Sequence, residues 1–257
     1  MNTIVAIPAF NDNYIWALHS LEGQQIIVVD PGDAAPVLNY LQANKLSLYA
    51  ILITHHHADH SGGILPLKEH FPDARVFGPT NEFVAGVTDP VTEGNTLSFA
   101  PFGLTLSVLD IPGHTKGHIA FYNDEILFCG DTLFSCGCGR VFEGTPAQML
   151  SSLEKLKQLP GHTLMYCGHE YTKANIAFAK VVDPANPELA KRLKQAEACL
   201  LKSQPTLPIS LQSEFLTNPF LRVNTKEIIY AVQKHCDLEQ NDPVSIFSHL
   251  REWKNKF

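Results

Sequence analysis

Residues 54–60 have the residue types of a metal-binding loop. They read Thr-His-His-His-Ala-Asp-His, so five of the seven carry an imidazole or a carboxylate. These groups are the usual protein ligands of zinc, iron and manganese. His55 and His57 are two residues apart, so in an extended segment they face the same side and can hold one ion. His56 faces the other side and is the least suited of the five to be a ligand.

The elements on either side of this loop give it a fixed place in the fold. Residues 49–53 are an apolar run typical of a buried strand, and Ser-Gly-Gly at 61–63 is typical of a turn or a helix start. Asp59 and His60 come where the chain turns, so they can reach a second ion. A solvated histidine tract would not sit between a buried strand and such a turn, and we interpret the loop as part of a folded site.

Other predicted strands also end in residues of metal-ligand type. Strand 104–109 is followed by His114, strand 126–129 by Asp131 and strand 164–167 by His169. Each of these has a neighbouring glycine that lets the backbone approach a buried ion: Gly113, Gly130 and Gly168. Strand 25–29 ends in Asp30, which is placed either to form a turn or to orient a ligand histidine. The repeated pattern predicts loops that converge on one site.

The seven ligand-type side chains divide between two ions. We assign them as follows: His55, His57 and His114 to the first ion, Asp59, His60 and His169 to the second, and Asp131 as the bridge. Two ions roughly 3.5–4 Å apart can share a water and lower its pKa toward neutrality. The bridging hydroxide would be the nucleophile, and Asp59 would orient it and accept its proton. The pattern therefore predicts metal-assisted hydrolysis with Asp59 and Asp131 as catalytic residues and two divalent ions, zinc first and iron or manganese as alternatives.

Composition narrows the class of protein. The chain has 257 residues, 45% of them hydrophobic and 18% charged, which is an ordinary globular balance. No run approaches the roughly 20 apolar residues of a membrane span, and residues 1–12 lack the pattern of a secretory signal. The net charge of -7 disfavours a nucleic-acid partner. We expect a cytoplasmic monomer with no membrane or nucleic-acid partner.

Secondary-structure patterns change character near residue 172. Strands are predicted at 3–7, 14–18, 25–29, 49–53, 75–77, 97–99, 104–109, 119–122, 126–129 and 164–167. Helices are predicted at 35–46, 63–70, 146–159, 172–182 and 188–202. Strand patterns largely vanish after residue 172, so we expect a catalytic domain at 1–172 and a helical domain at 173–257.

Six cysteines are present: Cys129, Cys136, Cys138, Cys167, Cys199 and Cys236. A chain of this size can bury a core without disulfides, and there is no Cys-x-x-Cys motif. Cys136-Gly-Cys138 is a weak hint of a soft-metal site. We expect reduced thiols that bind no metal.

The spacing His55-x-His57-x-Asp59-His60, with His114, Asp131 and His169 downstream, resembles the metallo-β-lactamase superfamily. The resemblance covers about two thirds of the chain, and every ligand position is filled. It implies an α+β fold, an αββα sandwich with the dinuclear site at one edge, here followed by a helical C-terminal domain.

More specific motifs resemble glyoxalase II, the hydroxyacylglutathione hydrolases. They are Gly-Asp-Thr-Leu-Phe at 130–134, Gly-Cys-Gly-Arg at 137–140, Phe-Glu-Gly-Thr at 142–145, Cys-Gly-His-Glu-Tyr-Thr at 167–172 and Asn-Pro-Phe-Leu-Arg at 218–222. Pro-Ala-Phe at 8–10 and Asp-Asn-Tyr at 12–14 belong to the same pattern. The resemblance implies hydrolysis of S-D-lactoylglutathione to D-lactate and glutathione, the second step of methylglyoxal detoxification.

The same resemblance implies where glutathione binds. The basic residue after the Gly-Cys-Gly turn is Arg140, the tyrosine after His-Glu is Tyr171, and the C-terminal cations that hold the glycine carboxylate are Arg251 and Lys254. Lys256 adds charge near the expected mouth. Some family members have a tyrosine where this chain has Phe142, which removes a hydroxyl. Arginine suits this role because it binds carboxylates in a bidentate way.

Other functions are open to the same scaffold. A glutathione persulfide dioxygenase would use one iron, and the complete Asp59, His60 and His169 set disfavours it. A lactamase is disfavoured by the Gly-Cys-Gly-Arg turn and the helical tail, and a nuclease by the net charge. A non-catalytic metal-binding module would not need an anion-binding tail.

Overall fold

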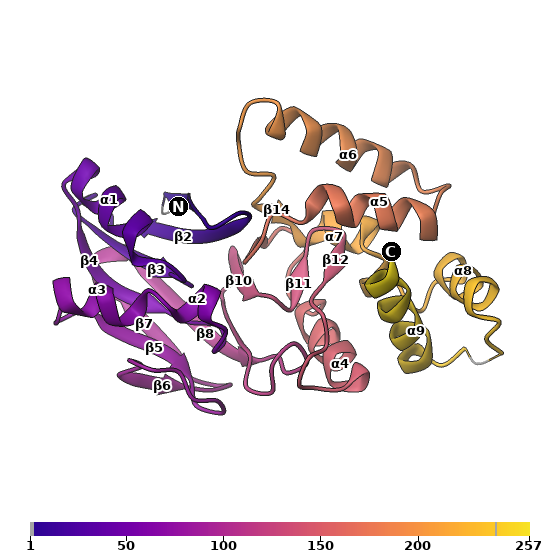
Figure 1. Ribbon diagram of the computed structural model, residues 1–257, viewed down its shortest axis with the longest axis horizontal. Coiled ribbons are helices and arrows are strands. Elements are labelled where there is room, and N and C mark those ends of the chain that lie inside the picture. Colours follow the sequence, from indigo (N-terminus) through magenta and orange to yellow (C-terminus); the bar gives the residue numbers. More distant parts are fainter. Residues whose placement is uncertain (1–2, 240) are drawn as a thin grey trace.

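Two packed β-sheets flanked by helices make up the first two thirds of the chain, and a group of helices follows (Figure 1). The structure is a computed structural model that describes residues 3–239 and 241–257. Among these residues no helix is both long and apolar enough to cross a membrane. The predicted αββα sandwich is confirmed, because each sheet has helices on its outer side.

The first sheet has the order β1-β2-β3-β4-β5-β6. Its strands are β1 Ile4–Ala9, β2 Asn13–His19, β3 Gln25–Val29, β4 Ser47–Leu52, β5 Arg75–Pro79 and β6 Asp89–Val91. The pairs from β1 to β3 are antiparallel, including the predicted hairpin at Glu22 and Gly23, and the pairs from β3 to β6 are parallel. The outer face is covered by α1 (Ala34–Asn44) and α3 (Ile64–His70).

The second sheet has the order β14-β13-β10-β9-β8-β7. Its strands are β7 Thr96–Phe99, β8 Leu104–Asp110, β9 Ile119–Tyr122, β10 Ile126–Gly130, β13 Leu164–Cys167 and β14 Ile209–Ser210. Between β10 and β13 the chain forms a small hairpin of β11 (Leu133–Phe134) and β12 (Gly137–Cys138), and then α4 (Pro146–Leu156). β10 and β13 are parallel.

The core follows from the alternation of side chains along strands that are buried on both faces. In β4, Leu52 faces the core between the sheets, while Ile51 faces α1 and α3. In β2, Trp16 faces the core between the sheets and Ile15 faces the helices on the outer side. All four side chains are nearly inaccessible to solvent. These strands therefore read as continuous apolar runs rather than alternating ones.

The C-terminal part consists of α5 Thr172–Val182, α6 Pro187–Leu200, α7 Leu211–Thr217, α8 Lys226–Cys236 and α9 Pro243–Lys256. Asn186 caps α6 by accepting the N–H of Glu188, with Pro187 at the first helical position. In Figure 1, α8 and α9 extend away from the sheets beyond α4.

All ten predicted strands and all five predicted helices are present, with ends shifted by a few residues. Four strands were not predicted: β6, β11, β12 and β14. The expectation that strands vanish after residue 172 was therefore not complete, because β14 lies in the helical part and pairs with β13. The missed strands have two or three residues each, too short to show a period.

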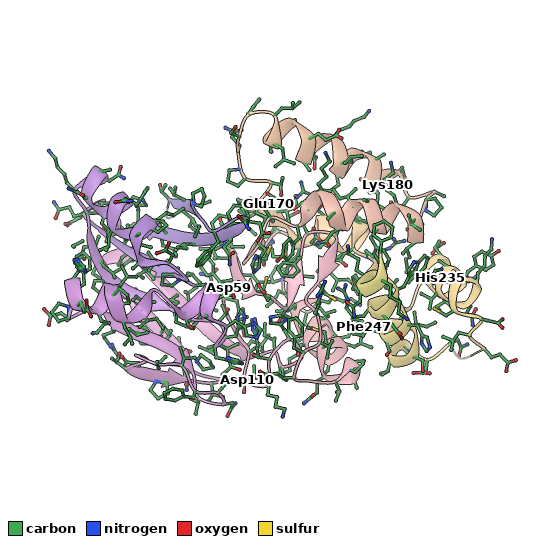
Figure 2. All side chains as sticks on the ribbon, viewed as in Figure 1. Asp59, Asp110, Glu170, Lys180, His235 and Phe247 are labelled. Atoms are coloured by element: carbon green, nitrogen blue, oxygen red, sulfur yellow. The ribbon has the colours of Figure 1, made fainter. Side chains whose placement is uncertain are left out.

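Strand ends explain how distant segments meet. β3 and β4 are parallel neighbours, and so are β10 and β13. Their carboxyl ends lie at the same edge of the sandwich, and the loops that leave those ends carry the ligand-type residues. Asp59 on α2 (Ala58–Ser61) lies near the middle of the molecule, close to where the first part of the chain meets the helical part (Figure 2).

Candidate metal centre

All seven predicted ligand residues come together in one site. The first group is His55, His57 and His114, whose donor nitrogens lie within 4.8 Å of one another. His57 Nδ1 is 3.1 Å from His55 Nε2 and 3.0 Å from His114 Nε2. In a tetrahedral zinc site with bonds of 2.0–2.1 Å, ligand atoms are about 3.3 Å apart. The spacing is within a few tenths of an ångström of that value.

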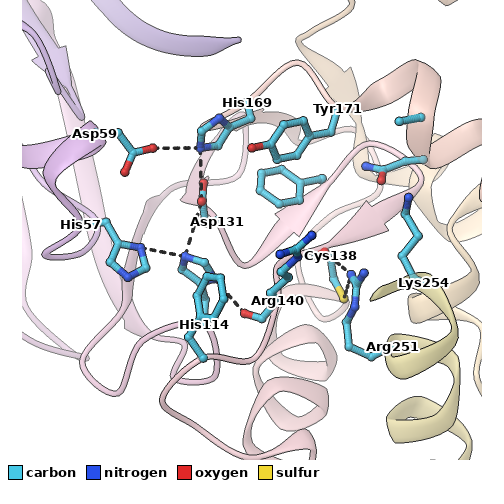
Figure 3. Close-up of a pocket in the computed structure, with 14 residues that line it drawn as sticks. His57, Asp59, His114, Asp131, Cys138, Arg140, His169, Tyr171, Arg251 and Lys254 are labelled. Carbon is cyan, nitrogen blue, oxygen red and sulfur yellow. Dashed lines mark hydrogen bonds and ion pairs between the residues drawn. The ribbon is translucent and has the colours of Figure 1, made fainter. Parts of the chain in front are cut away.

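The second group is Asp59, His60 and His169. His60 Nε2 and His169 Nε2 are 3.3 Å apart, and Asp59 Oδ2 is 3.5 Å and 3.4 Å from them. Asp131 lies between the groups (Figure 3): its Oδ2 is 3.5 Å from His114 Nε2 and 3.3 Å from His169 Nε2. This is the position that a bridging carboxylate requires.

The first group directs unprotonated nitrogens at one point. The hydroxyl of Thr54 donates its hydrogen bond to Asp30 Oδ2 at 2.7 Å. Thr54 Oγ1 has no second proton to donate, so it must accept the Nδ1–H of His55 at 3.0 Å. His114 donates its Nδ1–H to the carbonyl of Arg140 at 2.8 Å. Burial lowers the pKa of His55 and of His114, so both rings are neutral. Their Nε2 lone pairs both face His57 Nδ1, and a cation satisfies all three nitrogens at once.

The second group is fixed in the same way. His60 donates from Nδ1 to Asp30 Oδ2 at 3.0 Å, and His169 donates from Nδ1 to Asp12 Oδ1 at 2.7 Å. Both Nε2 atoms therefore face the site. Such carboxylate–histidine pairs set the tautomer and orientation of metal ligands. The predicted orienting role of Asp30 agrees with its contact to His60.

The charge of the site calls for cations. Burial opposes a charged ring at His169, but hydrogen bonds to Asp131 and Asp59 raise its pKa to about 10. Asp131 is buried, and its Oδ1 has no hydrogen-bond partner among the described residues. Burial alone would raise the pKa of Asp131, yet His60 and His169 hold it well below its usual range. A pocket that holds positive charge on its histidines, and in which Asp131 Oδ1 has only His60 Nε2 nearby at 3.4 Å among the described residues, fits divalent metal ions.

Two glycines are required where the loops meet. Gly130 has a φ of +45°, and a Cβ there would lie 2.3 Å from Thr54 Oγ1. A Cβ on Gly168 would lie 2.5 Å from Asp131 Oδ1 and from His60 Cε1. At both positions the backbone lies directly against side chains of the site, and the predicted approach to an ion stays a prediction. At Gly113 the reason is different, because its Cβ would clash with Met149 of α4 rather than with the site.

Several residues that support the site were missed by sequence reasoning. Asp12 orients His169, and Asn13 donates to Asp59 Oδ2 at 3.0 Å. His118 is fully buried, stacks on His55 at 4.6 Å between ring centroids, and accepts the backbone N–H of Asp131 at 3.1 Å. Asp12 and Asn13 belong to the Asp-Asn-Tyr motif at 12–14, which marked them without giving them a role. No local pattern points to His118, which acts across the fold.

Glu82 supports the site from outside. Its carboxylate accepts two backbone N–H groups, from His56 at 2.7 Å and from Gly117 at 2.9 Å. It thereby joins the loops that carry His55 and His114. His56 bonds to Glu143 at 2.8 Å and forms a partly exposed group with Glu143 and His57, so its exclusion from the ligand set stays a prediction.

A cavity of about 500 Å³ opens beside the metal-type residues (Figure 3). All four predicted glutathione-binding residues line it: Arg140, Tyr171, Arg251 and Lys254. The ring of Tyr171 stacks on His169 at 4.7 Å, and the exposed ring of Phe142 lies 5.2 Å from His114. The cavity therefore connects the two ligand groups with a set of cations.

The cationic side chains that line the cavity differ in solvent exposure and in their hydrogen bonds to the protein. Arg140 is exposed, whereas Arg251 is buried and donates from Nη1 to the carbonyl of Cys138 at 2.7 Å. Burial, with Arg251 and Arg140 nearby, lowers the pKa of Lys254. The expectation that Lys256 adds charge at the mouth was wrong: it pairs with Glu252 on the exposed face of α9 and does not line the cavity.

The cysteines take no part in the candidate ligand groups. All six are free thiols, as predicted. Burial raises the pKa of Cys136 to about 12, and it raises that of Cys138 to about 11 although Arg251 opposes the shift. A thiol that stays protonated is a poor metal ligand and a poor nucleophile.

Comparison with known proteins places the first part of the chain in a superfamily. Residues 14–169 match the family described as the metallo-beta-lactamase superfamily. Among solved structures, ETHE1 from Myxococcus xanthus is 26% identical with a TM-score of 0.59, and 84% of this chain and 96% of that one are covered. TTHA1623 in a di-iron-bound form is also 26% identical with a TM-score of 0.59, over 85% of this chain and 100% of that one.

Comparison over the whole chain identifies the family within this superfamily. Residues 170–257 match the family described as the hydroxyacylglutathione hydrolase C-terminus. A hydroxyacylglutathione hydrolase from Nitrosomonas eutropha is 52% identical over 100% of both chains. One from Xanthomonas campestris pv. campestris is 50% identical over 99% of this chain and 98% of its own. The chain belongs to the hydroxyacylglutathione hydrolase family of the metallo-beta-lactamase superfamily.

The position of Asp131 between the two groups generates a first prediction. Replacing Asp131 with Ala removes an anion that faces three histidines, so metal content and activity should fall together. Metal counting on the purified protein after dialysis measures the loss. Asp73→Ala, which removes an exposed carboxylate outside the site, should keep the wild-type metal count. A normal metal content in Asp131→Ala would contradict the bridging position.

The pair between Asp12 and His169 generates a second prediction. Asp12→Asn should weaken binding at the second group by about 10–100-fold, because an amide no longer fixes the His169 tautomer. The first group, which Asp12 does not contact, should keep its affinity. Stepwise titration with a chelator would resolve the two affinities, and an equal loss at both groups would show that Asp12 acts on the whole fold instead.

Proposed function

We propose that the protein hydrolyses S-2-hydroxyacylglutathione thioesters, and in particular converts S-D-lactoylglutathione to D-lactate and glutathione. This is the second step of methylglyoxal detoxification. One observation carries the proposal. Two neighbouring metal-ligand groups lie at a cavity that is also lined by Arg140, Arg251 and Lys254. Relatives about half identical over their full length bear the name hydroxyacylglutathione hydrolase, which supports the same substrate class.

The centre would hold two divalent ions, with His55, His57 and His114 at one and Asp59, His60 and His169 at the other. Zinc suits this set of imidazoles and carboxylates best, and iron and manganese suit it as well. The di-iron form of one structural relative supports a dinuclear centre. The ions would supply Lewis acidity, which activates water and polarises the thioester carbonyl.

The chain's own residues would then direct the reaction. A hydrogen bond from His169 lowers the pKa of Asp59 although burial opposes the shift, so Asp59 stays a carboxylate that can accept a proton from the attacking water. Asn13 holds Asp59 Oδ2 at 3.0 Å. The water oxygen bonds to the thioester carbon, the carbon–sulfur bond breaks, and sulfur leaves as a thiolate. Because a thiol has a pKa of about 8.5, the thiolate leaves without a general acid.

Glutathione would bind along the cationic side of the cavity. Its carboxylates would meet the charges of Arg140, Arg251 and Lys254, and Tyr171 would form the wall next to His169. Phe142 offers an apolar ring and no hydroxyl at this wall. The buried position of Arg251 suggests that it acts partly by holding the carbonyl of Cys138 in place.

Catalysis and substrate binding are assigned to successive parts of the chain. We infer a catalytic domain at 1–172 and a helical substrate-binding domain at 173–257, supported by the matched families, which meet at residues 169 and 170. The pairing of β14 with β13 joins the two parts across that division. The cytoplasmic location, the monomeric state and the absence of a nucleic-acid partner stay predictions.

The alternative, a glutathione persulfide dioxygenase, is less well supported. A second complete ligand group has no purpose in a mononuclear iron site, and the close relatives bear the hydrolase name. Oxygen consumption with glutathione persulfide would favour the dioxygenase.

The proposed reaction gives a direct test. Metal-loaded protein should hydrolyse S-D-lactoylglutathione, and dialysis against a chelator should abolish the activity until zinc, iron or manganese is restored. The loss of the thioester absorbance measures the rate, and metal counting is done on the same samples. If metal-loaded protein leaves the thioester intact, the assigned substrate is wrong.

The exposed cation of the cavity gives a further prediction. Arg140→Ala should raise KM about tenfold, because a charge-assisted bond to a carboxylate is lost, and should leave kcat within a factor of two. Lys116→Ala, in an exposed loop outside the cavity lining, is the matched control and should leave both constants unchanged. A fall in kcat alone would mean that Arg140 acts on the reacting atoms.

A further inference from the structure

The small hairpin of β11 and β12 lies between the metal centre and the glutathione side of the cavity. It begins two residues after Asp131 and ends two residues before Arg140. Its side chains are almost fully buried, and Cys136 at its turn has a left-handed φ of 56°. In Figure 3 the chain around Cys138 passes between Asp131 and Arg251. Any shift of this hairpin would therefore move a residue of the cavity.

Helical-domain side chains hold the hairpin by its backbone. Asn175 of α5 donates to the carbonyl of Ser135 at 3.1 Å. Asn218 donates to the carbonyls of Phe134 at 3.1 Å and Gly137 at 2.9 Å. Backbone carbonyls on both hairpin strands are thus satisfied by side chains from the second half of the chain.

Glu214 of α7 provides the charged part of this contact. It is fully buried, and its carboxylate accepts the hydroxyl of Ser135 at 3.0 Å and the backbone N–H of Cys136 at 2.7 Å. Asn218 donates to the same carboxylate at 3.0 Å. Burial raises the pKa of Glu214, while these donors and Arg192 oppose the shift.

Arg192 of α6 is the matching buried cation. Its Nε and Nη2 donate to Ser135 Oγ at 3.2 Å and 3.0 Å, and Nη2 also donates to the carbonyl of Thr206 at 3.0 Å. Ser135 Oγ accepts from Arg192 and donates to Glu214, so one hydroxyl of the hairpin joins a buried cation and a buried anion. A buried charge of this kind is costly unless its partners stay in place, so the network holds the turn rigidly.

We propose that Glu214, acting with Arg192 through Ser135, is a positioning residue that sets the glutathione-binding side of the cavity. The inference rests on the proposed function. The hairpin carries Cys138, whose carbonyl receives Arg251, and leads directly to Arg140. Loss of the Glu214 carboxylate would let the turn shift and would move both cations relative to the substrate.

The metal side of the hairpin has its own supports. The backbone N–H of Asp131 is held by His118, and the carbonyl of Arg140 accepts from His114. Neither bond depends on Glu214. We therefore expect a change at Glu214 to weaken glutathione binding while metal content and the chemical step are kept.

Glu214→Gln tests this with nearly equal volume. A glutamine offers one acceptor oxygen, and its amide N–H groups would face donors at Ser135, Cys136 or Asn218. KM for S-D-lactoylglutathione and the Kd for glutathione, measured by calorimetry on metal-loaded protein, should both rise about tenfold. The value of kcat should stay within twofold, and the metal count should not change. Ser135→Ala, which removes only the hydroxyl link, should raise both constants in the same direction by a smaller factor.

Asp183→Asn is the control for a purely structural effect. Asp183 is also buried in the helical domain, but its side chain bonds to Arg222 and Asn186, and none of its described hydrogen bonds goes to the hairpin. It should lower Tm without raising KM. Unchanged KM and Kd in Glu214→Gln, or a joint loss of metal and kcat, would overturn the inference. If Glu214→Gln does not fold, the same measurements on Ser135→Ala test the inference: unchanged KM and Kd would overturn it. A wild-type protein that leaves the thioester intact would instead contradict the proposed function.

Discussion

The structure depends on one electrostatic constraint, which is that the ring nitrogens of five histidines and the oxygens of two carboxylates converge on one buried centre. The Nδ1 protons of His55, His60, His114 and His169 are each committed to an oxygen behind the ring. Their Nε2 atoms therefore face the centre, where a neutral ring can bind a cation and a protonated ring, as at His169, donates to Asp59 and Asp131. Nitrogens held 3.0–3.3 Å apart repel one another unless a proton or a metal ion lies between them. The requirement for metal is thus built into the second layer of residues as much as into the ligands.

The fold meets this constraint by using strand ends as fixed points. Parallel pairs β3–β4 and β10–β13 bring their carboxyl ends to one edge, so short loops are enough to reach the centre. Asp30, at the end of β3, accepts from both Thr54 and His60, and so orients a residue of each ligand group through a single carboxylate. Such sharing explains why the loops must approach closely, and why Gly130 and Gly168 leave no room for a side chain.

Sequence reasoning succeeded where a residue type and a strand end coincide. The residues His55, His114, Asp131 and His169 follow apolar strands of four to seven residues, and a buried strand of this length has a recognisable local pattern. It found Asp12 only as part of the Asp-Asn-Tyr motif and assigned it no role, because its partner His169 is distant in sequence. It did not find His118, because nothing nearby in sequence marks it. Glu214 was missed for the same reason: a glutamate on a short amphipathic helix reads as a solvated charge unless the hairpin that covers it is known. The two-residue strands β11 and β12 have no period to detect.

The predicted metal ligands and two of the cavity cations lie in different parts of the chain. Every predicted ligand precedes residue 170, in the part that matches the metallo-beta-lactamase superfamily, whereas Arg251 and Lys254 lie on α9, in the part that matches the hydroxyacylglutathione hydrolase C-terminus. An overall charge of -7 would repel an anionic thioester, so cations must be gathered locally at the cavity. Cations on the helical part of the chain can act on the substrate only if that part is held in a fixed position relative to the metal-ligand groups. The hairpin between Asp131 and Arg140 meets this need, because it begins beside the metal ligands and is held by side chains of four helical-domain segments.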